Sequence, residues 1–415
     1  MKKIISILAA AALMLTMAAC LPVVPNNNEG SNIQNSESEA VPESSAADTS
    51  LIKDGYIDLM STENLSHREL ELVDVCWLDA SRLIIAAELE EDDSDKDLLR
   101  IVIVNIDNGE ESLLWEGEND MEDEHDTIST DGEYVYYRCK MVTTKRIRIS
   151  DGATETATDI ESGKGFGQNI PYLGKSIVTK EVEGDDNYQL FYDDVFAGER
   201  HELATESITS TVKKYEKYRK AENVPYTMNP IKEWSPDGEY ILFGYRTLTG
   251  PRGYFTDVGE HCTVYALDGS AVCGFAYDGF AEIEHFWSGD SNRLCFLMAM
   301  PGDKEDTFRE YRIAYREIDS GRDAEYPVSF TPDLSLLPRL VFSSDGEFCV
   351  FVQQNADESR SFCRYDLGGE VTELCRLPDA FGYDYVTAEI SHDDARIVYR
   401  LSEDDSMLVC IADVK

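Results

Sequence analysis

One pattern of polar and apolar positions recurs between residues 53 and 415. A short polar turn containing Ser, Asp and Gly is followed by a strand that has no polar face. The clearest copies are Ser129–Tyr134, Ser235–Tyr240 and Ser343–Phe348. Ser and Asp side chains accept hydrogen bonds from nearby N–H groups, and Gly takes the positive φ that reverses the chain. A following strand such as Tyr240–Tyr245 is therefore expected to be buried on both faces.

The pattern repeats often enough to predict a fold. Weaker copies of the turn begin at Leu78, Ser288 and Ser391, and a degenerate copy lies at Leu173–Ile177. A second pattern follows each turn, a strand closed by a hairpin with Asp and usually Gly, as in Ile101–Gly109. Repeats of about 50 residues are typical of propeller blades, four-stranded sheets that bury their faces only against neighbouring blades. We predict an all-β chain that forms a seven-bladed β-propeller.

The segment Trp234-Ser235-Pro236-Asp237-Gly238 resembles the hallmark of the TolB-like, or WD-repeat-like, propellers. The resemblance covers about residues 55–415. Because the third unit lacks the hallmark, six or eight blades are alternatives to seven. The last unit ends at Met407–Ala412 without an outer strand. We expect Gly55–Met60 to supply that strand and close the ring.

The N-terminus has the layout of a secretory signal. Lys2 and Lys3 precede a mostly apolar run over residues 4–19, which is shorter than the roughly 20 residues of a membrane-spanning helix. Thr16–Cys20 resembles the lipobox of bacterial lipoproteins, with Met17 where that family usually has Leu. The resemblance implies a signal peptide over residues 1–19 and a lipid, palmitate included, on Cys20. An ordinary signal peptide with an incidental Cys20 is the alternative.

Residues 20–52 are expected to form a disordered linker, because residues 21–50 contain no aromatic residue, Lys or Arg. The propeller would then occupy residues 53–415. These features together predict an extracytoplasmic protein that is anchored to the bacterial membrane through Cys20.

Charge narrows the choice of partner. The chain has 37 Lys+Arg and 81 Asp+Glu, a formal net charge of −44. Such a surface repels a phosphate backbone, which excludes unaided nucleic-acid binding. It also argues against docking on an anionic membrane by charge alone, and it favours cationic partners.

Signals for chemistry are few. The sequence contains no Gly-x-Ser-x-Gly, no phosphate-binding glycine loop and no His-Glu-x-x-His, so we assign no catalytic residue and expect no cofactor. Asp93, Asp95 and Asp97 alternate like the start of a calcium loop, but Leu98 takes the glycine place, which leaves only weak calcium binding by an acidic loop.

Histidines provide the second metal signal. Some TolB-like propellers are oligogalacturonate lyases that use a histidine-bound metal, and this resemblance makes four histidines candidate ligands of a transition metal. They are expected on or near the loop-rich face or the central tunnel: His125, His201, His261 and His285. Separate histidines that share no metal are the alternative.

Long irregular segments are expected on the face opposite the Ser-Asp-Gly turns. They are Glu90–Asp97, Trp115–Asp126, His201–Lys232, with helical spacing over Glu206–Asn223, and Arg246–His261. Loops on a rigid scaffold often carry binding residues. Aromatic and Arg side chains dominate interfaces, so the candidate contact residues are Trp115, Tyr226, Arg246, Arg252, Tyr254 and Phe255.

We interpret the sequence as a monomeric, surface-anchored lipoprotein whose propeller binds a protein or peptide partner and catalyses no reaction. The alternative is a carbohydrate-active enzyme, a metal-dependent lyase or a hydrolase, at the tunnel mouth. A structural module that contacts neighbouring envelope proteins is a third reading. Apart from Cys20 the chain has nine cysteines, which we expect to be free thiols, with Cys139, Cys295 and Cys349 inside apolar strands.

Overall fold

The structure, a computed structural model, describes most of the chain beyond residue 51. The described residues are 52–53, 56–57, 62–65, 70–89, 97–121, 128–139, 143–158, 172–181, 187–207, 227–248, 262–275, 281–301, 308–328, 330, 340–357, 359–377, 385–403 and 406–414. Every regular element among them is a β-strand. No helix in this part of the chain is long and apolar enough to cross a membrane. The predicted signal peptide, Cys20 and nearly all of the predicted linker lie outside the described residues.

The strands form seven sheets, which are the seven blades of a propeller. Blade 1 contains β3 (Leu70–Trp77), β4 (Arg82–Leu89), β5 (Leu98–Asn105) and β6 (Glu111–Glu118). Blade 2 contains β7 (Ser129–Thr130), β8 (Tyr134–Arg138), β9 (Thr143–Arg148) and β10 (Thr154–Thr158). Blade 3 contains β11 (Lys175–Glu181), β12 (Asn187–Asp194) and β13 (Glu199–Ser207). Blade 4 contains β14 (Thr227–Trp234), β15 (Tyr240–Leu248), β16 (Cys262–Ala266) and β17 (Ala271–Phe275). Blade 5 contains β18 (Ala281–Trp287), β19 (Arg293–Pro301), β20 (Phe308–Glu317) and β21 (Asp323–Val328). Blade 6 contains β22 (Val341–Phe342), β23 (Phe348–Gln354), β24 (Arg360–Asp366) and β25 (Val371–Arg376). Blade 7 contains β26 (Tyr385–Ile390), β27 (Arg396–Glu403), β28 (Ser406–Asp413), β2 (Tyr56–Ile57) and β1 (Ile52–Lys53).

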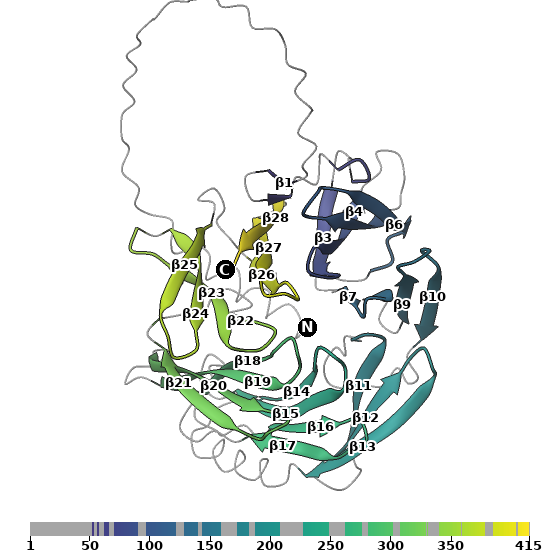
Figure 1. Cartoon of the computed structure of the whole chain (residues 1–415). Coiled ribbons are helices and arrows are strands. Elements are labelled where there is room, and N and C mark those ends of the chain that lie inside the picture. Colours follow the sequence, from purple (N-terminus) through teal and green to yellow (C-terminus); the bar gives the residue numbers. More distant parts are fainter. Residues whose placement is uncertain are drawn as a thin grey trace, which may run out of the picture. The chain divides into compact units, whose positions relative to one another are not determined.

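The prediction of seven blades is confirmed, and Figure 1 shows them around a common centre.

The two ends of the ring join in blade 7, as the sequence predicts. Tyr56 and Ile57 in β2 pair with Cys410 and Val409 in β28. Ile57 is buried in a cluster with residues of blade 1, such as Leu83. The N-terminal strand thus covers the sheet edge that the last blade would otherwise expose.

Strands run further than the apolar pattern predicts. β6 continues to Glu118, so Trp115 lies inside a strand and not in a crossover. β13 reaches Ser207, β14 begins at Thr227 and β15 reaches Leu248, which shortens two of the predicted irregular segments. Outer strands are half exposed and carry many polar residues, so the apolar pattern does not mark their ends. The rest of the predicted helical stretch, residues 208–223, lies outside the described residues.

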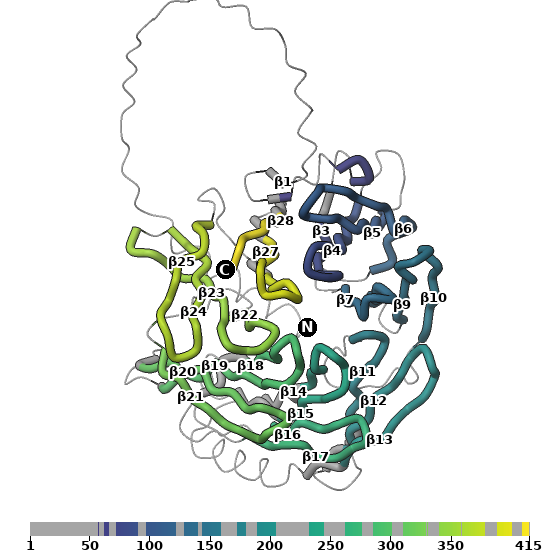
Figure 2. Tube along the Cα trace, in the orientation of Figure 1, coloured from purple at the N-terminus to yellow at the C-terminus, as the bar shows by residue number. Residues whose placement is uncertain are grey.

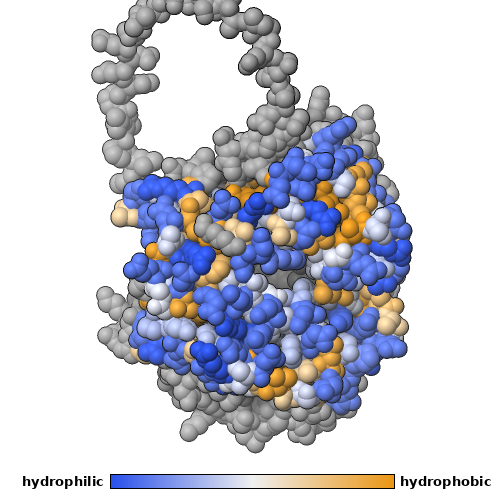
Figure 3. All heavy atoms as spheres, in the orientation of Figure 1, coloured by the Kyte–Doolittle hydropathy of each residue, from blue (hydrophilic) through white to orange (hydrophobic). Residues whose placement is uncertain are grey.

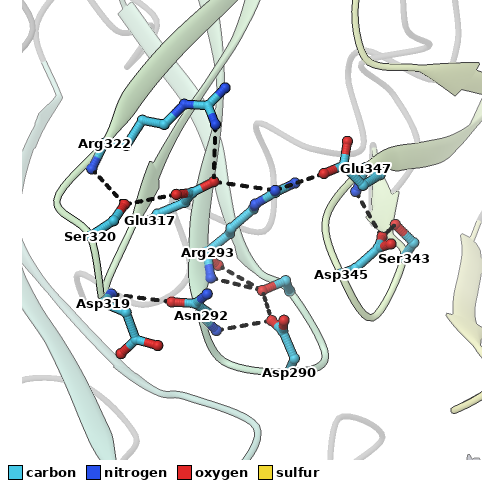
Figure 4. A network of polar contacts seen from close by, with 11 residues as sticks. Asp290, Asn292, Arg293, Glu317, Asp319, Ser320, Arg322, Ser343, Asp345 and Glu347 are labelled. Carbon is cyan, nitrogen blue, oxygen red and sulfur yellow. Dashed lines mark hydrogen bonds and ion pairs between the residues drawn. The ribbon is translucent and has the colours of Figure 1, made fainter.

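The Ser-Asp turns are held by their own side chains. Ser235 Oγ donates to Asp237 Oδ1 at 2.6 Å and accepts the N–H of Tyr240 at 2.9 Å. Asp237 Oδ1 also accepts the N–H of Glu239 at 2.9 Å. The same bonds recur where Ser288, Ser343 and Ser391 start the turn, and all four serines are buried. Figure 4 shows two of these turns, those of blades 5 and 6.

Consecutive turns also bond to each other. The αL position, which is Gly238 in blade 4 and Gly346 in blade 6, is Ser291 (φ 61°) in blade 5 and Asp394 (φ 56°) in blade 7. Ser291 Oγ accepts the N–H of Asp237 from blade 4 at 3.0 Å. Asp394 accepts the N–H of Ser344 from blade 6 at 2.6 Å and its hydroxyl at 2.5 Å. Side chains occupy these strained positions because they tie one blade to the blade before it.

Apolar side chains fill the seams, by which we mean the interfaces between consecutive blades. Six clusters of buried residues among the described part of the chain span the seams 7–1, 1–2, 3–4, 4–5, 5–6 and 6–7. In each second strand the residues alternate between the preceding and the following seam, as with Leu294 and Cys295 in β19. The core is therefore a ring of separate seams.

Replacement of Asp394 tests the bonds between turns. Asp394→Gly removes the strain at φ 56° but loses two bonds to Ser344, so we expect a net loss of about 1 kcal/mol of unfolding free energy. Asp394→Asn, which tolerates the αL region and keeps an acceptor, should lose less. Thermal unfolding of the three proteins measures the order. A glycine variant as stable as the natural protein would show that these bonds contribute nothing.

Candidate functional site

The innermost strands meet at the centre of the ring, and polar side chains on them form the candidate site. These strands are β3, β7, β14, β18, β22 and β26. Figure 3 shows the surface hollowed where they converge. Each inner strand pairs with only one neighbour in its sheet, so its other edge and the side chains near it face the centre.

Glu389 and Asp74 lie close together between blades 7 and 1. Glu389 Oε2 accepts the N–H of Trp77 at 3.3 Å, and its carbonyl accepts the indole N–H of Trp77 at 3.1 Å. Burial, helped by the charge of Asp74, raises the pKa of Glu389 to about 8. Burial likewise raises the pKa of Asp74, against the opposing effect of Arg400, whose Nη1 lies 3.6 Å from Asp74 Oδ1. The centre thus holds a carboxyl group that keeps its proton at neutral pH.

Tyr172 joins blade 3 to blade 4. Its hydroxyl donates to the carbonyl of Pro236 at 3.0 Å. Burial, helped by the charges of Glu389, Cys76 and Asp237, raises the pKa of Tyr172 to about 12. The phenol therefore stays protonated at neutral pH and acts as a hydrogen-bond donor.

Blades 4 and 5 contribute a second polar group. His285 Nε2 on β18 lies 2.6 Å from Glu233 Oε2 on β14. Beside Glu233, burial lowers the pKa of Lys232 to about 8. Glu233 and Glu389 occupy the same place in their blades, two residues before the serine of the turn.

Groups with strongly shifted pKa values often mark functional sites. Glu389, near pKa 8, can donate or accept a proton near neutral pH, and so can Lys232. Glu389 is already bonded to Trp77, and Asp74 to the N–H of Ile128 at 2.9 Å. These bonds hold the blades together, so the arrangement suits recognition of a polar ligand as well as structural support.

Sequence reasoning missed Glu389, Asp74 and Lys232. For Glu389 one signal was available: it stands two residues before the serine of its turn, as Glu233 does, so the repeat alignment places both on the strand that precedes the turn.

The structure does not bring the candidate histidines together. His285 lies on the innermost strand of blade 5, whereas His201 lies on the outermost strand of blade 3, stacked on Tyr192 at 4.5 Å between ring centroids. His201 Nε2 is 3.5 Å from Glu199 Oε2. The two histidines therefore lie on an inner and an outer strand of different blades. His125, His261, Asp93 and Asp95 lie outside the described residues, and within the described ones no three metal-ligating side chains form a group.

Trp115 is the one predicted contact residue whose side chain the structure describes. Its ring lies 6.3 Å from that of Tyr137, and Lys145 Nζ sits 4.8 Å above it. It packs against the seam between blades 1 and 2, which gives it a structural role. Tyr226, Arg252, Tyr254 and Phe255 lie outside the described residues, and Arg246 is placed only as a position in β15.

All nine cysteines beyond Cys20 are free thiols in the structure. Cys295 and Cys349 are buried in blade strands, as predicted, whereas Cys139 is buried just beyond the end of β8. Burial raises the pKa of Cys295 and Cys349. A thiol held in its protonated form is a poor nucleophile, so these cysteines act as small apolar side chains.

Glu389 makes stability depend on pH. Its folded pKa of about 8 lies above the ordinary 4.5, so its contribution is complete below about pH 4.5 and is lost as the pH rises to about 8. Glu389→Gln carries no charge, so we expect it to unfold at a higher temperature than the natural protein near pH 9 and at a similar one near pH 4.5. Thermal unfolding across this range measures the effect. Glu233→Gln, at the same blade position, is the control, and an equal effect there would contradict the assignment.

Comparisons with known proteins support the fold. No protein-family model matches the chain, and no curated protein matches its sequence. A solved oligogalacturonate lyase in complex with manganese is similar at a TM-score of 0.52 and 13% identity, over 84% of this chain and 90% of that one. An acylaminoacyl peptidase from Pyrococcus horikoshii is similar at 0.47 and 13%, over 81% and 50%. TolB from Acinetobacter baumannii is similar at 0.35 and 15%, over 74% and 65%. With its seven sheets arranged around one centre, the chain has the fold of a seven-bladed β-propeller.

Proposed function

We propose that this protein is a bacterial surface lipoprotein whose propeller binds a protein or peptide partner and catalyses no reaction. The observation that supports this proposal most is that the described polar groups hold the fold together. The turn serines, Glu389, Asp74 and the Glu233–His285 pair each join strands or neighbouring blades. Such groups make a rigid platform rather than a set of reactive side chains.

Charge indicates the kind of partner. The net charge of −44 favours a cationic protein or peptide, because complementary charge speeds encounter and selects partners. Exposed carboxylates recur on the turn face, as with Glu239 in blade 4 and Glu347 in blade 6. This face offers a cationic partner a surface of opposite charge.

The alternative is a metal-dependent carbohydrate lyase. The similar lyase was solved with manganese, and its likeness to this chain at 13% identity concerns the fold. Here His285 is the candidate ligand closest to the centre, and its Nε2 is engaged by Glu233 at 2.6 Å. A metal site would have to combine His285 with residues outside the described part of the chain.

Anchoring is tested at Cys20. We expect mass spectrometry of the N-terminal peptide from the membrane-bound protein to show a chain that begins at Cys20 and carries acyl groups. Cys20→Ser should release the protein from the membrane fraction. Because it leaves residues 53–415 unchanged, its thermal unfolding should match that of the natural protein. An unmodified Cys20 on a released natural protein would contradict the proposal.

Metal content separates binding from the lyase alternative. We expect elemental mass spectrometry of the full chain, before and after chelation, to find no stoichiometric transition metal. We also expect binding of a purified partner to weaken as ionic strength rises. A stoichiometric metal that is lost in His285→Ala but kept in His201→Ala would overturn the proposal in favour of the lyase, since of the two described candidate histidines only His285 lies on an innermost strand.

A further inference from the structure

The seam between blades 2 and 3 differs from the others. Each of the other six seams holds a cluster of buried apolar residues, whereas no such cluster among the described residues spans blades 2 and 3. Figure 2 shows the two blades as neighbours in the ring, with β9 and β10 in one and β11 and β12 in the other. Among the described residues, hydrogen bonds between turns join blade 3 to blade 4 through Tyr172 and Pro236, blade 4 to blade 5, and blade 6 to blade 7.

Thr144 provides the first polar position in this seam. It lies on the third strand of blade 2, opposite the fifth residue of the second strand, Arg138. The matching position in the other six blades is apolar and buried in every case: Ile101, Leu190, Cys262, Ile313, Phe362 and Val409. Thr144 is equally buried, and its hydroxyl has no hydrogen-bond partner.

Ser176 provides the second polar position, from the opposite side of the seam. It is the second residue of the second strand of blade 3, and this residue faces the preceding blade. The matching residues elsewhere are again apolar and buried: Leu83, Val135, Ile241, Leu294, Cys349 and Ile397. Ser176 is 3% exposed, and its hydroxyl also has no partner. A buried hydroxyl without a partner favours any state in which water reaches it.

Charged and aromatic groups occupy the rest of the seam. The ring of Tyr136 in blade 2 meets that of Phe196 in blade 3 edge-on, with 6.1 Å between the ring centroids. Asp193, which pairs with Ser176, is buried and forms two bonds of 2.7 Å with Arg200 of its own blade. The guanidinium of Arg146 bridges the two blades, 4.4 Å from the ring of Tyr134 and 4.2 Å from that of Phe196. Separating these charged groups costs less free energy than exposing apolar side chains, because water solvates the charges when the blades part.

We propose that the ring opens at the seam between blades 2 and 3, before the six seams that hold apolar clusters. Opening hydrates Thr144 and Ser176, whose buried hydroxyls gain partners, while each neighbouring seam stays closed around its cluster. The propeller therefore has one built-in joint through which its interior face becomes accessible. The proposal concerns the scaffold and does not depend on which partner the protein binds.

Thiol labelling of the full chain tests the joint. Cys349 is natural at the position in blade 6 that matches Ser176 in blade 3, and it is 0% exposed. In Ser176→Cys we expect iodoacetamide, read out by peptide mass spectrometry, to label the new thiol at least about tenfold faster than Cys349 in the same molecule. Both rates are normalised to those of the unfolded chain. The new labelling rate should also depend less on urea than that of Cys349, because local opening exposes less surface than global unfolding.

Two matched variants separate the polar positions from other causes. Thr144→Val removes one unpartnered hydroxyl at similar shape, so it should slow labelling in the Ser176→Cys protein several-fold. Ile313→Thr places the same residue at the matching position of the seam between blades 5 and 6, so it should accelerate labelling of Cys349. Equal labelling of the two seams, or labelling of both in step with global unfolding, would overturn the proposal.

Discussion

The blades of this protein depend on their neighbours, because most second strands are apolar on both faces, as β19 is. Burial of those faces against the adjoining blades is the interaction on which the rest of the structure depends. Leu294, Phe296 and Met298 of one strand pack against blade 4, while Cys295, Leu297 and Ala299 of the same strand pack against blade 6. A ring is the arrangement in which every such face finds a partner, provided that the last blade meets the first.

Polar groups set the spacing and order of the blades within that ring. Buried turn serines fix the reversal between the first and second strands, and the hairpin after each third strand bonds to the same turn, as Ile318 N–H does to Asn292 at 2.7 Å. Arg293 then bridges its own Glu317 and Glu347 of the next blade (Figure 4). Polar contacts therefore link the turns of blades 3 to 7 in succession, above the apolar seams.

Most of the fold was predictable because its physical cause is local and repeated. The Ser-Asp-Gly turn and the doubly apolar strand both follow from a few adjacent residues, so even the degenerate turn at Leu173–Ile177 could be counted as a blade. Closure by Tyr56 and Ile57 was predictable because one blade lacked a strand. The centre was harder to predict: the pairing of Glu233 with His285, or of Glu389 with Trp77, depends on contacts between blades that sequence spacing does not encode. The histidines illustrate the same limit. The sequence placed His201 and His285 alike on or near the loop-rich face or the central tunnel, whereas they lie on an outer and an inner strand.

Closure has a mechanical consequence. Two residue pairs, Tyr56 with Cys410 and Ile57 with Val409, join the N-terminal strand to the last blade. Any pulling force that arrives along the N-terminal segment therefore acts first on this short contact, at the place where the ring is joined. Such a force would be resisted by the burial of Ile57 among residues of blades 1 and 7 rather than by the many hydrogen bonds of a long strand. The propeller thus carries its most force-sensitive contact where its own chain enters it.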